Sequence, residues 1–139
     1  MRCTKMHGAG NSFIITESLR GELRGEDLSL LALRLCDPKT GPGADGLIVV
    51  LPGSADADFE MLFYNSDGSL GEMCGNGIRC VGKYVYDFGL TDKETITVST
   101  KSGIKELRLF PEDGKIARVR VNMGPAILEA ADIPVIRLG

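Results

Sequence analysis

The sequence predicts an α/β protein of the α+β kind, in which a curved, mostly antiparallel sheet wraps around a central helix. Short apolar runs with alternating character recur along the chain, which is typical of strands. One segment, residues 76–88, is apolar around most of its circumference, as a buried helix is. Glycine makes up 18 of the 139 residues, against a usual share of about 7%, and many glycines stand at turns between the apolar runs. A chain of this length is about one domain and can bury a single core.

The first half of the chain is predicted to contain four strands and one helix. The helix is expected over 26–36, because its leucines form a broad apolar face and an acidic residue, Glu26 or Asp27, stands near its start. Asp37-Pro38 then ends it, since the residue before a proline is disfavoured in the helical region. Ser66-Asp67-Gly68 is a turn signal. The expected strands are 1–6, 12–16, 47–51 and 59–64, with a tight connection at 7–11.

The second half is predicted to contain the central helix and three further strands. Within 76–88, Arg79, Lys83 and Asp87 fall on one narrow stripe, whereas apolar residues occupy most other positions. Such a helix is mostly buried, and Gly89 is a C-terminal stop signal. The expected strands are 95–99, 104–110 and 116–122.

Cys74 is the candidate reactive group of the chain. It stands in Glu-Met-Cys-Gly-Asn-Gly-Ile-Arg-Cys, residues 72–80, which leads directly into the central helix. A cysteine thiol with a pKa near ~8.5 is lowered to roughly 3.5–7.5 beside a helix N-terminus, so this thiol could act as a base or nucleophile. A lone cysteine is most often a small buried hydrophobic residue. Gly75 and Gly77 favour the functional interpretation, because they leave backbone N–H groups open to an anionic ligand.

This motif is one of five strings that occur in an order and spacing far more specific than any one of them. They are Lys-Met-His-Gly-Ala-Gly-Asn-Ser-Phe (5–13), Gly-Ala-Asp-Gly-Leu-Ile (43–48), Tyr-Asn-Ser-Asp-Gly-Ser (64–69), Met-Cys-Gly-Asn-Gly-Ile-Arg-Cys (73–80) and Val-Asn-Met-Gly (121–124). From Met1 to about Pro125 the chain resembles the diaminopimelate epimerase family. The resemblance implies a cofactor-independent isomerase, without pyridoxal phosphate, that converts LL- to meso-diaminopimelate for lysine and cell-wall precursor biosynthesis. It implies two catalytic cysteines, one on each face of the substrate.

The chain supplies one of these two cysteines, Cys74. Family members contain two similar α/β domains, and the second cysteine lies in a Cys-Gly-Thr-Gly type context that this sequence lacks. We therefore expect residues 1–118 to form the amino-terminal domain and residues 119–139 to begin a crossover toward a second domain that is absent from this chain.

The resemblance also implies substrate contacts from Asn11, Asn65, Gly75 and Asn76. Each asparagine has a plainer alternative: Asn11 as a loop residue, Asn65 as a cap of the following turn, and Asn76 as the helix N-cap, which is compatible with binding through its N–H. Some family members carry Gln in place of Gly46, so no side-chain contact is expected at that position.

Composition excludes several classes of function. The chain is 43% hydrophobic and 25% charged with a net charge of −3, which fits a soluble globular protein and gives no sign of a membrane span. Its 16 basic residues are spread among 19 acidic ones, so no basic stripe for nucleic acid is expected. The first residues lack the apolar stretch of a signal peptide, and we expect a cytoplasmic protein with a small-molecule substrate. The oligomeric state is left open, with a homodimer as the candidate assembly.

Metal binding is not expected, because the cysteines are irregularly spaced and His7 is the single histidine. The other cysteines are expected to be core or near-surface thiols, and His7 a structural loop residue. They are Cys3, Cys36 and Cys80.

Two alternative functions stay open. A proline racemase or hydroxyproline epimerase also uses two cysteines on a related fold, but its motif resembles Met-Cys-Gly-His, whereas this chain has Asn76. The second alternative is a half-domain that binds a ligand without catalysis, because one thiol alone cannot invert a carbon centre.

Overall fold

The computed structural model describes residues 2–8, 10–71, 75–122 and 135–137. The two helices of this part of the chain are α1 (Leu28–Cys36) and α2 (Gly75–Asp87). Its strands are β1 (Cys3–Gly8), β2 (Asn11–Glu17), β3 (Gly46–Pro52), β4 (Phe59–Asn65), β5 (Leu70–Gly71), β6 (Thr95–Thr100), β7 (Gly103–Glu112), β8 (Lys115–Asn122) and β9 (Val135–Arg137).

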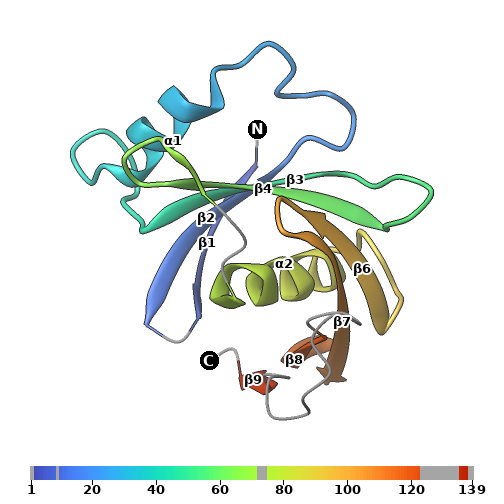
Figure 1. Cartoon of the computed structure of the whole chain (residues 1–139). Helices are drawn as coiled ribbons and strands as arrows, with labels where there is room; N and C mark the ends of the chain where they lie inside the picture. The colour runs from blue at the N-terminus through green and yellow to red at the C-terminus, as the bar shows by residue number, and fades with distance from the viewer. Residues whose placement is uncertain (1, 9, 72–74, 123–134, 138–139) are drawn as a thin grey trace.

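All nine strands belong to one sheet, in the order β1-β2-β3-β4-β6-β7-β8-β9, with β5 paired to β4 alone. The pairs β2–β3 and β4–β6 are parallel, and the other pairs are antiparallel. The sheet curls so that its inner face surrounds α2 (Figure 1). The prediction of a curved, mostly antiparallel sheet around a central helix is confirmed.

The core lies between α2 and the inner face of the sheet. Ile78, Val81 and Tyr84 of α2 are fully buried, and they pack with Phe13 of β2 and Leu107 of β7 in one hydrophobic cluster. Burial of this many large apolar side chains, at roughly 25 cal/mol per Å² of apolar surface, is the main force that holds helix and sheet together.

Two residues of the charged stripe of α2, Lys83 and Asp87, contact the backbone of β8. Lys83 Nζ donates to the Ile116 carbonyl at 2.7 Å and forms an ion pair with Asp87 at 2.8 Å. Asp87 in turn accepts from the Ile116 N–H at 2.8 Å. The stripe therefore satisfies backbone groups at the start of β8 and fixes the position of α2 against the sheet.

The outer face of the sheet is covered at β2 and β3 by α1 (Figure 1). Asp27 caps this helix, because its side chain accepts from the Leu30 N–H at 3.1 Å. The helix consequently begins at Leu28 rather than at residue 26. Because α1 and α2 cover opposite faces, β3 is buried without alternation from Gly46 to Val50, as is typical of strands that are covered on both sides.

One difference from the expected elements concerns the ends of two strands. The β1–β2 hairpin pairs as far as Gly8 and Asn11, so the strands extend into the expected connection at 7–11, where Gly10 has φ of 91°. Residue 118, where the domain boundary was expected, lies in β8, whose Arg118–Arg120 segment also pairs with β9; the boundary itself stays a prediction.

Candidate functional site

The expected contact residues lie at one end of the sheet. Asn11 begins β2, and Gly46 begins the parallel neighbour β3. Asn65 ends β4 and is the antiparallel register partner of Gly46. The strand directions therefore bring Asn11 and Asn65 to the same edge, although they are far apart in sequence.

A direct contact joins this edge to the start of α2. Asn76 Nδ2 donates to Asn11 Oδ1 at 2.8 Å, across 65 residues of sequence. Asn76 Oδ1 accepts from Arg79 Nη1 at 2.8 Å, one helical turn further along α2. Arg79 is only 8% exposed. Two of the residues singled out by the sequence are thus joined directly, and Arg79, which was assigned only to the charged stripe, binds one of them.

Gly75 is the first residue of α2, so the N–H groups of the first turn have no acceptor within the helix. Among the described residues, a Cβ atom at Gly75 would meet Arg79 Nη2 alone, at 3.8 Å. The helix start carries the positive end of the helix dipole beside this guanidinium group. Cys74, the residue before it, lies outside the described residues.

Phe63 packs between Gly46 and Gly71 at the end of the sheet where Asn11 and Asn65 lie, which we call the site edge. A Cβ atom at Gly46 would lie 2.4 Å from Phe63 Cε1, and one at Gly71 would lie 2.7 Å from Phe63 Cδ2. Phe63 also meets Phe13 edge-on, with ring centroids 6.0 Å apart. These glycines are needed because β3 and β5 flank the ring on both sides, which explains why a side chain at position 46 does not fit here.

Asn65 is engaged in the turn that follows it. Its Nδ2 donates to Ser69 Oγ at 3.0 Å, and its carbonyl accepts from the Gly68 N–H at 2.9 Å. Ser69 Oγ donates to Asp67 Oδ1 at 2.6 Å, and this hydrogen bond lowers the pKa of Asp67. The turn-capping alternative for Asn65 therefore has a structural basis, and the substrate contact stays a prediction.

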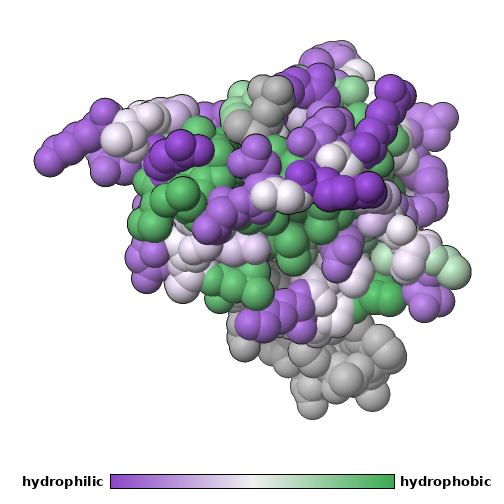
Figure 2. All heavy atoms as spheres, turned by 90° about the horizontal axis from the view of Figure 1, so that it is seen from above, coloured by the Kyte–Doolittle hydropathy of each residue, from purple (hydrophilic) through white to green (hydrophobic). Residues whose placement is uncertain are grey.

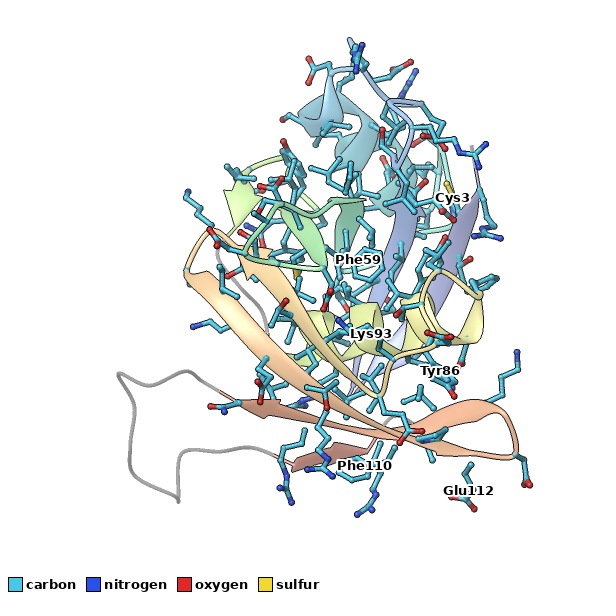
Figure 3. The ribbon with its side chains drawn as sticks, turned by 90° about the vertical axis from the view of Figure 1, so that its right-hand side faces the viewer. Cys3, Phe59, Tyr86, Lys93, Phe110 and Glu112 are labelled. Carbon is cyan, nitrogen blue, oxygen red and sulfur yellow. The ribbon has the colours of Figure 1, made fainter. Side chains whose placement is uncertain are left out.

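The three thiols of the described residues lie in the core or at the surface, as expected. Cys36 and Cys80 are buried, whereas Cys3 is exposed on β1 (Figure 3). Desolvation raises the pKa of both Cys3 and Cys36, so neither thiol is activated as a thiolate. His7 lies in β1 opposite Ser12 rather than in a loop.

Four residues that contact the expected site residues or pack beside them were not identified from the sequence. They are Arg79, Phe63, Ser69 and Gly71. The contact of Arg79 could have been found, because residues three apart on a helix are neighbours. The packing of Phe63 depends on the pairing of three strands, and no local pattern indicates it.

Two cavities of the described part of the chain lie away from the expected site residues. One of about 250 Å³ opens between β4, β5 and the β6–β7 turn, and Phe63 and Gly71 form its wall on the side of the site. Another of about 600 Å³ lies beneath residues 18–28, on the face that Figure 2 shows as apolar surface interleaved with hydrophilic side chains. None of Asn11, Asn65, Gly75 and Asn76 lines either cavity.

Within the described ranges, no three His, Cys, Asp or Glu side chains gather as a metal site would require. No helix in those ranges is long and apolar enough to cross a membrane.

Solved structures of the same fold include several racemases, epimerases and isomerases. A hydroxyproline epimerase from Agrobacterium vitis superposes with a TM-score of 0.69 at 15% identity, over 87% of this chain and 40% of that one. A predicted epimerase from Pseudomonas aeruginosa gives a TM-score of 0.67 at 13% identity, over 88% and 43%. The chain thus has the fold of the epimerase and racemase class.

Comparison of the amino-acid sequence identifies one family within this fold. The family model for diaminopimelate epimerase matches residues 3–129. The diaminopimelate epimerase of Agathobacter rectalis is 50% identical over 99% of this chain and 47% of its own length, and that of Caldanaerobacter subterraneus is 52% identical over 97% and 47%. This chain belongs to the diaminopimelate epimerase family, and it spans about half the length of the curated relatives that it matches.

Proposed function

We propose that this chain is the amino-terminal half of a cytoplasmic diaminopimelate epimerase, which interconverts LL- and meso-diaminopimelate without a cofactor. The observation that carries the proposal is the 2.8 Å hydrogen bond between Asn76 and Asn11. It joins two expected substrate contacts at an open helix start, in a chain that belongs to the family.

The proposed chemistry is proton transfer at one α-carbon. An α-proton of an amino acid is a very weak acid, so a thiolate removes it only where the growing negative charge is stabilised. Cys74 is the proposed base, since its sequence position directly precedes Gly75 and the donors of the first helical turn. The same N–H groups, with the side chains of Asn11 and Asn76, are the proposed partners of the substrate carboxylate.

Inversion needs a proton donor on the opposite face of the carbon. We assign that donor to a second cysteine in the remainder of the protein, because the described thiols of this chain are buried or lie on β1. A closed site between the two halves would keep bulk water from exchanging with the thiolate and the carbanion.

The test uses the full-length protein that carries this chain, incubated with LL-diaminopimelate in heavy water. The expected result is meso product with deuterium at one α-carbon. In the Cys74→Ser variant, epimerisation should fall by orders of magnitude, because a serine hydroxyl is far less acidic than a thiol. Near wild-type turnover of that variant would exclude Cys74 as a proton-transfer group.

The two alternative functions predict different outcomes. A proline racemase or hydroxyproline epimerase would exchange the α-proton of proline or hydroxyproline and leave diaminopimelate unlabelled. A non-catalytic half-domain would label neither substrate, even as part of the full-length protein. Sedimentation of the same protein tests the homodimer, the assembly that we propose for it.

A further inference from the structure

We infer that Arg79 is a positioning residue that fixes the orientation of the Asn11 and Asn76 side-chain amides, so that the pair presents hydrogen-bond donors to a carboxylate. The inference deepens the proposed function and rests on it for the identity of the substrate. The orientation of the amides itself rests on the two hydrogen bonds that link Arg79 to Asn76 and Asn76 to Asn11.

The guanidinium group of Arg79 has hydrogen-bond donors and no acceptor. Arg79 Nη1 therefore requires an oxygen opposite it, and Asn76 Oδ1 lies 2.8 Å away. The two ends of an asparagine amide are told apart by such partners. Once its oxygen faces Arg79, Asn76 must direct its NH₂ group elsewhere.

The orientation of the Asn76 amide determines the orientation of the Asn11 amide. Asn76 Nδ2 lies 2.8 Å from Asn11 Oδ1, so the oxygen of Asn11 is turned toward Asn76. The Nδ2 group of Asn11, on the other side of that amide, donates to none of the described residues. One cation thus determines which ends of two successive amides are oriented toward a ligand.

Burial makes this orientation persistent. Arg79 is 8% exposed, and both asparagines are partly buried. A hydrogen bond to a charged group is worth about 1.5–3 kcal/mol, more than a neutral one, and water has little access to compete for it. The Arg79 guanidinium also lies beside Gly75, where its charge adds to the positive end of the helix dipole.

The fixed orientation of the two amides favours binding of a carboxylate. A pair of amides that offers NH₂ groups next to the free N–H groups of a helix start matches a carboxylate, which only accepts hydrogen bonds. If the orientation were not fixed, either amide could rotate and present an oxygen, which would repel a carboxylate. Arg79 therefore acts on substrate affinity through Asn76 and Asn11 without touching the substrate.

The test compares Arg79→Gln with Arg79→Lys in the full-length protein. Glutamine both donates and accepts, so it no longer determines the orientation, whereas lysine only donates. We expect KM for diaminopimelate to rise about tenfold in Arg79→Gln, equivalent to about 1.4 kcal/mol, and clearly less in Arg79→Lys. Arg118→Gln, which removes the same charge beside Phe110 on the exposed outer face of β8 (Figure 3), is the control and should leave KM unchanged.

A purely structural role gives a different result. Loss of folded enzyme lowers the apparent kcat and leaves KM unaltered, so an unchanged KM in Arg79→Gln would overturn the inference. Equal KM values for the glutamine and lysine variants would overturn it as well.

A second measurement does not depend on activity. In the ¹⁵N-labelled 139-residue chain, one side-chain N–H proton of Asn76 should exchange slowly with water in the wild type and in Arg79→Lys, and faster in Arg79→Gln. Identical exchange in all three would refute the role of Arg79 even if the protein is an epimerase. A wild-type protein inactive on diaminopimelate, with the expected exchange pattern, would refute the proposed substrate and leave the amide orientation supported.

Discussion

Replacement of Gly46 by alanine tests the packing that positions the site edge. The new Cβ atom would lie 2.4 Å from Phe63 Cε1, 3.1 Å from Phe63 Cζ and 3.0 Å from the Tyr64 carbonyl oxygen. Carbon atoms in contact prefer about 3.5–4.0 Å, so the ring must move by more than an ångström. On its other side the ring approaches the β5 backbone, since a Cβ at Gly71 would lie 2.7 Å from Phe63 Cδ2, and it borders the cavity of about 250 Å³.

Two opposing contributions determine how much Gly46→Ala changes the free energy of unfolding. Overpacking of a well-packed site costs about 1–3 kcal/mol. Alanine in place of glycine in a strand recovers about 0.5–1 kcal/mol, because the unfolded chain loses less conformational entropy on folding. The central values of the two contributions leave a net cost, so we expect Gly46→Ala to lower the free energy of unfolding by about 1 kcal/mol, measured as a lower urea midpoint with an unchanged m value.

A double-mutant cycle with Phe63→Leu tests the cause. Leucine lacks the ring atoms that the new methyl group would meet, so most of the cost of Gly46→Ala should disappear in that background. Additive effects of the two substitutions would refute the explanation, as would a Gly46→Ala protein as stable as the wild type.

Two further predictions concern titration and reactivity. In the folded chain, iodoacetamide should modify Cys74 before any other cysteine, because a thiol ahead of a helix start is more acidic than a buried one or one on a strand; faster labelling of another thiol would remove the basis for assigning Cys74 as the base. Burial and the hydrogen bond to Glu17 raise the pKa of Tyr84 from its usual value of 10.0 to about 12. The folded state therefore keeps a proton that the unfolded chain loses, and stability should fall as pH rises from 10 to about 12. Urea unfolding across that range should show a smaller loss in Tyr84→Phe, and an equal loss would exclude this tyrosine as the cause.

The sequence predicted the elements with strong periodicity and missed those that are too short to have one. Helix α2 was expected at 76–88 and occupies Gly75–Asp87, because its apolar residues recur with the helical period over three turns. Strands β5 and β9 have two and three residues, and no alternation can be recognised over that length. The parallel pairing of β2 with β3 also could not be derived from the sequence. It depends on the crossover connection between the two strands, which contains α1.

The candidate site was predictable in part. The open helix start at Gly75 follows from a glycine-rich segment that leads into a helix, which is a local pattern. The contact between Asn11 and Asn76 spans 65 residues, and it exists because the curl of the sheet brings the β1–β2 hairpin to the start of α2. A resemblance to a family can name both residues, but only the fold shows that they touch.

Glycine at the site edge has two roles that a motif alone does not separate. At the start of α2, Arg79 Nη2 is the one atom of the described residues that approaches the place of the missing Gly75 side chain, and we propose that this place faces the ligand. Gly46 and Gly71 instead make room for Phe63, whose strand β4 ends two residues later at Asn65. Substitution of Gly75 should therefore affect ligand binding first, and substitution of Gly46 or Gly71 should affect stability first. Because the same residue type serves recognition at one position and packing at the others, its presence in a shared string is not by itself evidence of contact with the substrate.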